Sequence, residues 1–298
     1  MPLPAWISAT RPKTLAAGAV PVAVGTALAG TVTSIDWAVA GGCLAGALLI
    51  QIGCNFANDA FDALKGADTA ARVGPQRAVA AGLISARAML AATVVVLACA
   101  LGLGLWLSTI GGWPILALGV LSLLCAVAYT GGPYPLAYIG LGDLFVVLFF
   151  GLFAVLGSAW LQIADMAAPG LPALWWWVAV GLGLQAATII CVNNLRDIAT
   201  DAPAGKRTLC VRLGDRASRF YYLGLHLAAA LAYLLAAACS TPLTREPFMA
   251  AAMIAAVGGL LLAKGVMRAE GAGLNVYLAR SALLELVTGA GLAAMLSI

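Results

Sequence analysis

The sequence predicts an all-α protein, a polytopic membrane helix bundle of about nine transmembrane helices around a central cavity. Of its 298 residues 63% are hydrophobic and only 9% are charged, and the mean hydropathy is +1.02. A soluble domain carries about 25% charged residues, so lipid must solvate much of this chain. The apolar stretches are long and continuous, which favours helices over the short alternating strands of a membrane barrel.

Nine apolar segments are each long enough to cross the hydrocarbon core, which takes roughly 20 residues per helix. Their expected bounds are 14–32, 37–58, 88–108, 113–130, 141–163, 172–192, 220–240, 247–267 and 277–297. Glycine and proline interrupt the apolar pattern between several of them. We expect a single domain over residues 1–298, built from two weakly related halves at about 1–140 and 141–298.

The basic residues are distributed asymmetrically. With nine spans, every Lys and Arg among the 16 except Arg245 falls on one side of the membrane. The positive-inside rule makes that side the cytoplasm and places the N-terminus there. Such a one-sided basic surface suits an anionic headgroup or an anionic substrate, with the lipid bilayer rather than nucleic acid as the large partner.

The second predicted span ends in the polar motif NFANDAFDALKGAD. Asn58 and Asp62 are four residues apart and therefore share one face of a helix. Asp68 follows a glycine, where the chain can turn back toward the same pocket. Asp59 points about 100° away from that face, according to the helical period. The expected ligand set of this motif is Asn58, Asp62 and Asp68.

The sixth predicted span ends in a similar motif, NNLRDIATDAPAGKRTLCVRLG, 135 residues further along. Asn193, Asp197 and Asp201 follow at successive spacings of four and are expected on one helix face, before Pro203 and Gly205 end the helix. Since both even-numbered spans end on the same side, we expect the two motifs to face each other across one cavity.

Carboxylates near membrane depth are costly, so they indicate a functional site by default. Oxygen-only ligands favour Mg²⁺, with Mn²⁺ as a substitute, and Mg²⁺ completes its shell with water and phosphate oxygens. Two such ions, together with nearby cations, would stabilise a departing diphosphate. The diphosphate-binding candidates are Lys65, Arg72, Arg77, Lys206 and Arg207. The alternative is a pair of interfacial loops in which acids and bases pair at the surface.

The two motifs resemble the aspartate-rich signatures of the UbiA-type prenyltransferase superfamily. Their matching patterns are ND-x-x-D-x-x-x-G-x-D and NNLRD-x-x-x-D-x-x-x-GK-x-T-L-x-VRLG. Four further strings resemble the branch that prenylates 1,4-dihydroxy-2-naphthoate in menaquinone biosynthesis. These strings are RPKTL, VGPQRAVAAGLIS, YTGGPYPLAYIGLGD and FFGLFAVLGSAWLQ. The chain departs from relatives at Ala60, where they often carry an aromatic residue.

The resemblance implies an enzyme of a bacterial plasma (inner) membrane. It would transfer a polyprenyl group from polyprenyl diphosphate to 1,4-dihydroxy-2-naphthoate with loss of CO₂, giving demethylmenaquinol, with Asp62, Asp197 and Asp201 in the catalytic roles. Another aromatic acceptor, such as 4-hydroxybenzoate or homogentisate, would use the same fold and metal chemistry. A secondary transporter would need acids near the bilayer midplane, and a CDP-alcohol phosphotransferase would need a DG-x-x-AR string, which is absent.

Three more residues are candidates for binding the acceptor. By resemblance, Arg11 binds the acceptor carboxylate; the alternative is a topology anchor at the start of the first span. Tyr129 either lines the pocket or is an interfacial aromatic. Asp143 either faces the cavity or caps the helix that begins beside it.

Overall fold

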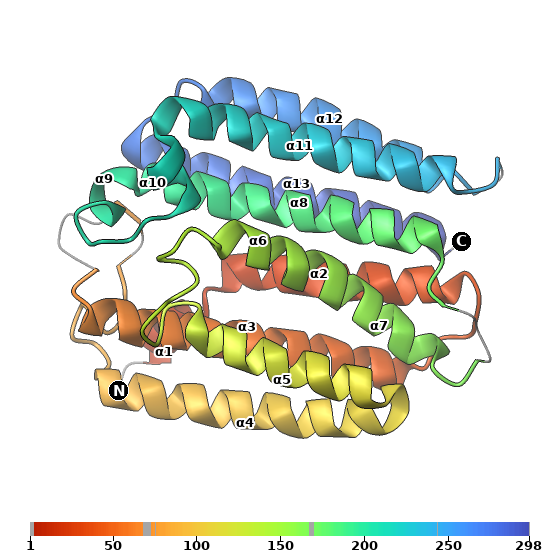
Figure 1. The fold of residues 1–298 in the computed structure, drawn as a ribbon, viewed down its shortest axis with the longest axis horizontal. Helices are drawn as coiled ribbons and strands as arrows, with labels where there is room; N and C mark the ends of the chain where they lie inside the picture. Colours follow the sequence, from red (N-terminus) through yellow and green to blue (C-terminus); the bar gives the residue numbers. More distant parts are fainter. Residues whose placement is uncertain (1–2, 68–72, 75, 167–169, 243, 298) are drawn as a thin grey trace.

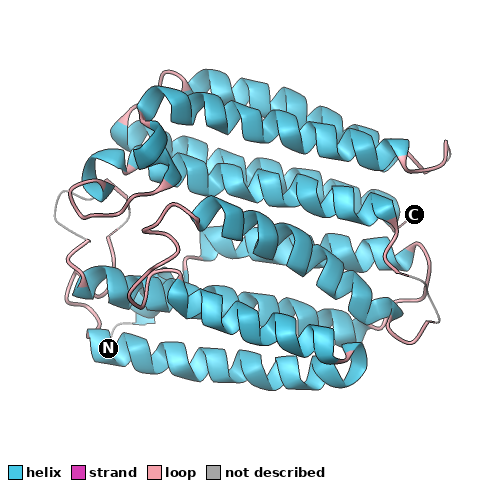
Figure 2. Ribbon diagram, viewed as in Figure 1, coloured by secondary structure: helices cyan, strands magenta, loops and turns pink. Residues whose placement is uncertain are grey.

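The computed structural model describes residues 3–67, 73–74, 76–166, 170–242 and 244–297, and the regular elements within these ranges are all helical (Figure 2). The long helices are α2 (Pro12–Gly30), α3 (Trp37–Leu64), α4 (Ala86–Gly111), α5 (Trp113–Ala128), α8 (Ala173–Arg196), α11 (Asp215–Ala238), α12 (Glu246–Val266) and α13 (Leu274–Leu296). The short elements are α1 (Leu3–Thr10), α6 (Gly142–Val146), η1 (Val147–Phe153), α7 (Ala154–Ile163), α9 (Ile198–Asp201), α10 (Leu209–Leu213) and η2 (Gly271–Gly273).

Each of the nine predicted spans corresponds to a helical segment, the fifth being the continuous run α6–η1–α7. Among the described residues, seven helices are long and apolar enough to cross a membrane. The bent pair formed by α1 and α2, with an angle of 49° between them, brings the number to eight. Helix α5 has only 16 residues, so the expected count of nine is approximate.

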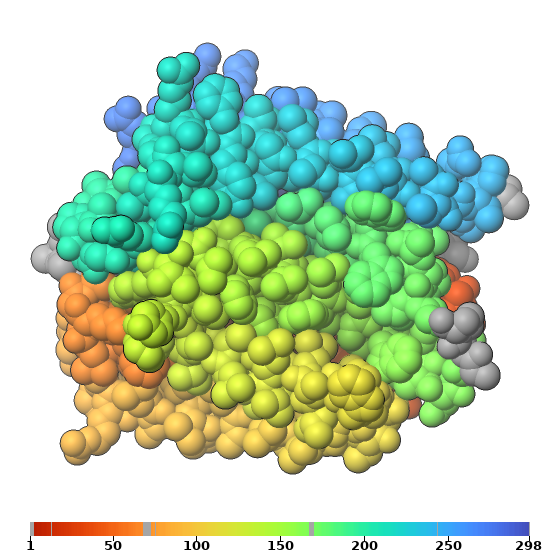
Figure 3. All heavy atoms as spheres, in the orientation of Figure 1, coloured from red at the N-terminus to blue at the C-terminus, as the bar shows by residue number. Residues whose placement is uncertain are grey.

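The two polar motifs lie at the same end of the bundle. Helix α3 and helix α8 both end there, beside α9 and α10, while the C-terminus lies at the opposite end (Figure 1). Helix α8 packs against α11, α13 and η1, and α3 packs against α4, α2 and α5. Side chains fill the spaces between the ribbons on the face shown in Figure 3. The topology thus brings together two motifs that are far apart in the sequence.

The segment η1 is a π-helical insertion in the middle of a span. Here the backbone approaches α8 very closely: a Cβ atom on Gly183 would lie 2.6 Å from the Val147 carbonyl oxygen and 3.0 Å from the Cα of Gly151. Insertions of this kind widen a helix locally and recur at functional sites. Paired glycines let the two helices touch at their backbones, as small residues do in membrane bundles.

This contact predicts that Gly183→Ala lowers stability by about 1–3 kcal/mol, because the added methyl group meets backbone atoms that cannot move aside. The measurement is thermal unfolding of the purified protein in detergent. Gly102→Ala is the matched control, since Gly102 on α4 faces open space, and this variant should unfold at or above the wild-type temperature. Equal transitions for both variants would show that the backbone contact contributes nothing.

Candidate active site

A cavity of about 400 Å³ lies within the helix bundle. Asn58 and Asp62 line it from α3, and Asn193 lines it from α8. The remainder of its wall is largely apolar and includes Phe145, Phe149 and Phe153, whose rings form consecutive contacts with centroids 6.0 and 5.1 Å apart. The cavity therefore joins a polar end to an aromatic and aliphatic body.

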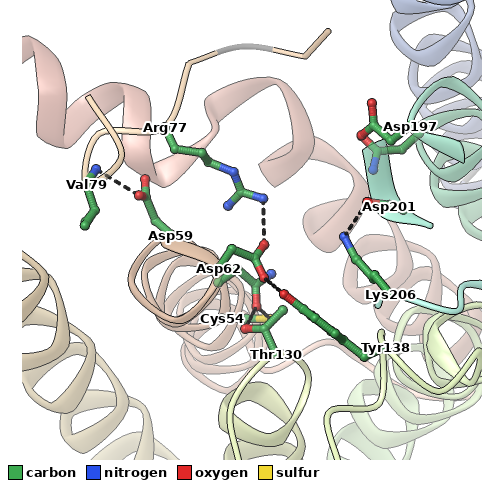
Figure 4. Close-up of polar contacts among 12 residues, drawn as sticks. Cys54, Asp59, Asp62, Arg77, Val79, Thr130, Tyr138, Asp197, Asp201 and Lys206 are labelled. Atoms are coloured by element: carbon green, nitrogen blue, oxygen red, sulfur yellow. Dashed lines mark hydrogen bonds and ion pairs between the residues drawn. The ribbon is translucent and has the colours of Figure 1, made fainter. Parts of the chain in front are cut away.

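The first motif points two buried polar side chains toward the polar end. The Oδ1 atom of Asn58 accepts a hydrogen bond of 2.7 Å from the Thr130 hydroxyl. The Asp62 carboxylate accepts one of 2.8 Å from the Tyr138 hydroxyl and one of 3.2 Å from Nη2 of Arg77 (Figure 4). Asp62 is thus held from both sides by residues that follow it in the chain.

Asp59 has a different role from its neighbours in the motif. Its carboxylate accepts hydrogen bonds from the backbone N–H groups of Ala78, at 3.1 Å, and Val79, at 3.0 Å. Figure 4 shows the bond from Val79. This agrees with the expectation that Asp59 points away from the Asn58 and Asp62 face. Because these two bonds fix the backbone directly after Arg77, Asp59 places that guanidinium opposite Asp62.

The second motif is not one continuous helix, which corrects the expectation from its spacing. Helix α8 ends at Arg196, Asp197 has φ −96° and ψ 6°, and α9 begins at Ile198. Arg196 binds the carboxylate of the adjacent Asp197 at 2.7 and 2.6 Å. Neighbouring side chains in a helix do not face each other, so this contact agrees with the interruption of the helix at Asp197.

Despite the break, the three predicted ligands stay one turn apart. The N–H of Asp197 still donates to the carbonyl of Asn193, and the N–H of Asp201 donates to that of Asp197, at 3.2 and 2.8 Å. Lys206 lies 3.5 Å from Oδ1 of Asp201 (Figure 4). The three polar side chains are thus presented in succession toward the end of the bundle where the first motif lies.

Asp201 gives an independent indication of a cation site. Its Oδ2 atom is buried and has no hydrogen-bond partner among the described residues. Burial raises the pKa of Asp201 to about 6; the Lys206 ammonium opposes this rise, while the carboxylates of Asp197 and Asp62 add to it. Two carboxylates of one motif and one of the other therefore lie within electrostatic reach of each other, a situation that a divalent cation relieves.

The described residues supply only part of the expected set of metal ligands. Within the described ranges no three Asp, Glu, His or Cys side chains gather closely enough to hold an ion. Asp68 and Arg72 fall outside those ranges. Carboxylate and amide oxygens from two facing motifs fit Mg²⁺, which takes few protein ligands and fills its shell with water and substrate phosphate oxygens. The donor set thus suits a metal that binds together with a phosphorylated ligand.

The predicted diphosphate-binding cations separate into three groups. Arg77 and Lys206 line the cavity. Lys65 lies beside it, where its Nζ atom donates to the Thr130 carbonyl at 2.6 Å and lies 4.8 Å from the centre of the Tyr138 ring. The Arg207 side chain is exposed and is not part of the cavity wall, so the structure does not bring it to the others.

Sequence reasoning missed two residues of this site. Tyr138 binds Asp62 through its hydroxyl, and the ammonium groups of Lys65 and Lys206 lie 4.8 and 5.7 Å from the centre of its ring. Arg196 was counted only toward the basic face, although it directly precedes Asp197. The sequence signal for Arg196 was its place in the string Asn-Asn-Leu-Arg-Asp at the end of a predicted span. An arginine between two predicted metal ligands at this depth requires an acidic or amide partner.

The three acceptor-binding candidates all line the cavity. Arg11 precedes α2 in a left-handed conformation with φ 54°. Tyr129 directly follows α5. Asp143 makes no capping hydrogen bond at the start of α6; Oδ1 accepts from the Tyr221 hydroxyl at 3.4 Å, and Oδ2 is buried without a hydrogen-bond partner in the described structure. These contacts favour a cavity role for Asp143 over a cap.

The role of Asp59 yields a test. In Asp59→Ala two backbone N–H groups lose their acceptor, so we expect about 1–3 kcal/mol of destabilisation and faster hydrogen exchange at residues 77–79. Asp36→Ala is the matched control, because Asp36 accepts from Ala38 and Val39 N–H at the other end of α3. That variant should leave exchange at 77–79 unchanged. Unaltered exchange in Asp59→Ala would contradict the assignment.

Comparisons with known proteins agree with this geometry. The model of the UbiA prenyltransferase family matches residues 18–275. The 1,4-dihydroxy-2-naphthoate octaprenyltransferase of Escherichia coli (strain K12) is 42% identical over 226 residues, covering 73% of this chain and 71% of that protein. The protein of the same name from Mycobacterium tuberculosis is 40% identical over 220 residues, covering 74% and 73%.

Solved structures show the same fold. A UbiA homolog from Archaeoglobus fulgidus, described as bound to DMAPP and Mg²⁺, superimposes with a TM-score of 0.71 at 16% identity, covering 99% of both chains. An apo UbiA homolog from Aeropyrum pernix K1 gives 0.71 at 19% identity, covering 94% of this chain and 96% of that one. With the family model matching most of its length, the chain belongs to the UbiA prenyltransferase family.

Proposed function

We propose that this protein transfers a polyprenyl group from polyprenyl diphosphate to 1,4-dihydroxy-2-naphthoate with loss of CO₂, giving demethylmenaquinol. One observation carries the proposal: a cavity joins a polar end, lined by Asn58, Asp62, Arg77, Asn193 and Lys206, to a largely apolar body. The polar end suits a diphosphate and the apolar body suits an isoprenoid. The curated relatives at about 40% identity carry the name of this activity and support the choice of acceptor.

The proposed metal is Mg²⁺, bound as two ions, with Mn²⁺ as a substitute. Its protein ligands in this proposal are Asn58, Asp62, Asp68, Asn193, Asp197 and Asp201. When bound, Mg²⁺ supplies the positive charge that stabilises the diphosphate as it leaves. The presence of DMAPP and Mg²⁺ in the A. fulgidus homolog is consistent with this assignment.

The chain's own cations orient the diphosphate. Arg77 and Lys206 line the cavity, and each is paired with one carboxylate. In the proposal these two residues and Lys65 release their protein partners and bind phosphate oxygens, and Arg72 binds phosphate as well. Such charge-assisted hydrogen bonds are the stronger kind and are directional for arginine.

The remaining residues bind the acceptor and exclude water. The Arg11 guanidinium holds the naphthoate carboxylate, with Tyr129 and Asp143 placing its ring. As the allylic C–O bond breaks, its oxygen and its electron pair leave with the diphosphate, and the electron-rich ring carbon forms a bond to the isoprenyl carbon. The bond between the ring and the carboxylate also breaks, and the carboxylate leaves as CO₂. The apolar wall keeps water from the allylic cation, which water would otherwise quench.

We also propose the plasma membrane of a bacterium, with the N-terminus and the site facing the cytoplasm. All Lys and Arg residues except Arg245 belong to segments on that side under the positive-inside rule. Water-soluble dihydroxynaphthoate then enters from the cytoplasm, while the isoprenoid remains in lipid.

The chemical proposal predicts that Asp62→Ala and Asp197→Ala each reduce turnover by at least about 10²-fold, because each removes a proposed ligand of the Mg²⁺ that stabilises the departing diphosphate. The assay uses purified protein, Mg²⁺, a polyprenyl diphosphate and dihydroxynaphthoate. Asp36→Ala, which changes a carboxylate at the other end of α3, should keep full turnover. Turnover with 4-hydroxybenzoate but not with dihydroxynaphthoate would refute the acceptor assignment.

The topology predicts selective labelling of Cys239. This cysteine is exposed and ends α11, at the end of the bundle opposite to the motifs. In intact spheroplasts a membrane-impermeant maleimide should label the wild type, and Cys239→Ser should abolish the signal. Labelling that requires permeabilised membranes would reverse the proposed orientation.

A further inference from the structure

The guanidinium of Arg196 donates four hydrogen bonds at the second motif. Nε and Nη2 donate to the two carboxylate oxygens of Asp197, at 2.7 and 2.6 Å. Nη2 also donates to Oδ1 of Asn193 at 2.9 Å, and Nη1 donates to Oδ1 of Asn275 at 2.7 Å. A guanidinium has five N–H groups in a rigid plane, so these four bonds fix its orientation almost completely.

The partners of Arg196 come from different parts of the chain. Asn193 and Asp197 are proposed metal ligands at the end of α8, whereas Asn275 lies in the first turn of α13. Gly74, which follows α3 in the chain, also lies close to the guanidinium: a Cβ atom on Gly74 would lie 2.8 Å from Nη2 and 3.1 Å from Cζ. Arg196 is therefore enclosed by both halves of the protein.

Arg196 differs from the cations that are proposed to bind diphosphate. Lys206 makes a single ion pair of 3.5 Å with Asp201 and lines the cavity. Arg196 is buried, has four N–H bonds to protein oxygens and does not line the cavity. Releasing it would leave Asp197 and two amide oxygens without donors, which is costly for buried groups.

We propose that Arg196 is a positioning residue, which orients the oxygens of Asn193 and Asp197 toward the metal, and that Asn275 and the close approach of Gly74 hold Arg196 in place. This inference rests on the proposed function, because it assumes a metal at the second motif. Each bound oxygen keeps a lone pair for the ion while the guanidinium fixes its direction. Groups that orient ligands in this way usually contribute 10–100-fold to metal affinity.

The test perturbs Arg196 from two separate elements without changing any ligand. In Asn275→Leu the acceptor for Nη1 is lost, and in Gly74→Ala the added methyl group displaces Nη2. The apparent Mg²⁺ affinity is measured from the Mg²⁺-dependent rise in Tm at a fixed concentration of inorganic pyrophosphate. We expect both variants to bind Mg²⁺ about 10-fold or more weakly. Asn275→Asp keeps an acceptor oxygen and should restore most of the affinity.

A control separates positioning from stability. Asp215→Asn weakens another arginine–aspartate pair, that of Arg219 with Asp215 at 2.7 and 2.9 Å, which lies away from the cavity. It should change Tm without Mg²⁺ but leave the Mg²⁺ affinity at the wild-type value. Since Asn275→Leu and Gly74→Ala alter no proposed ligand, lower Tm values with unchanged Mg²⁺ affinity would overturn the positioning role.

The outcomes also distinguish the two proposals. If Mg²⁺ and pyrophosphate fail to stabilise the wild type, the proposed metal chemistry is wrong. If they stabilise the wild type and both variants with equal affinity, only the role of Arg196 is wrong. Failure of Asn275→Asp to recover affinity would show that the hydrogen bond to Nη1 is not the feature that matters.

Discussion

The site depends on the pairing of buried carboxylates with cations. Three carboxylates of the two motifs each have a basic partner: Asp62 with Arg77, Asp197 with Arg196, and Asp201 with Lys206. An isolated buried charge would cost several kcal/mol, so these pairs allow the polar end of the cavity to exist without substrate. Each pair also brings one negative and one positive charge together, so the charge of each carboxylate is compensated within the protein.

The three ion pairs differ in how firmly their side chains are held. Asp201 retains one oxygen without a hydrogen bond from any described residue, and its ion pair with Lys206 is long. Arg196, in contrast, is fixed by four hydrogen bonds. The site therefore combines cations that can change partners with one that stays in place, as expected of a preorganised centre.

Much of the fold was predictable because segment length and apolarity are properties of sequence alone. All nine expected spans are helical, yet α5 has only 16 residues, so hydropathy does not settle how many cross the membrane. The π-helical turn in η1 was not predictable. It lies where Gly151 approaches Gly183 on α8, and the sequence around one glycine does not show which distant residue packs against it.

The convergence of the two motifs was predictable from the parity of the spans, since both even-numbered spans end on one side. Individual contacts were not. Helical spacing places Asp197 relative to Asn193, but it does not show that the helix is interrupted at Asp197 or that Arg196 binds this immediate neighbour. Likewise, Tyr138 joins the site through a loop whose path no periodic pattern describes.

The backbone contact between η1 and α8 has a consequence for substrate length. Gly151 and Gly183 leave no gap between these helices. The aromatic wall of the cavity therefore has no room to move outward for a longer isoprenoid chain. The facing side is different: Gly119 on α5 borders the cavity with open space where a side chain would stand. Selection among isoprenoids of different size should accordingly evolve by enlarging or trimming residues along α5.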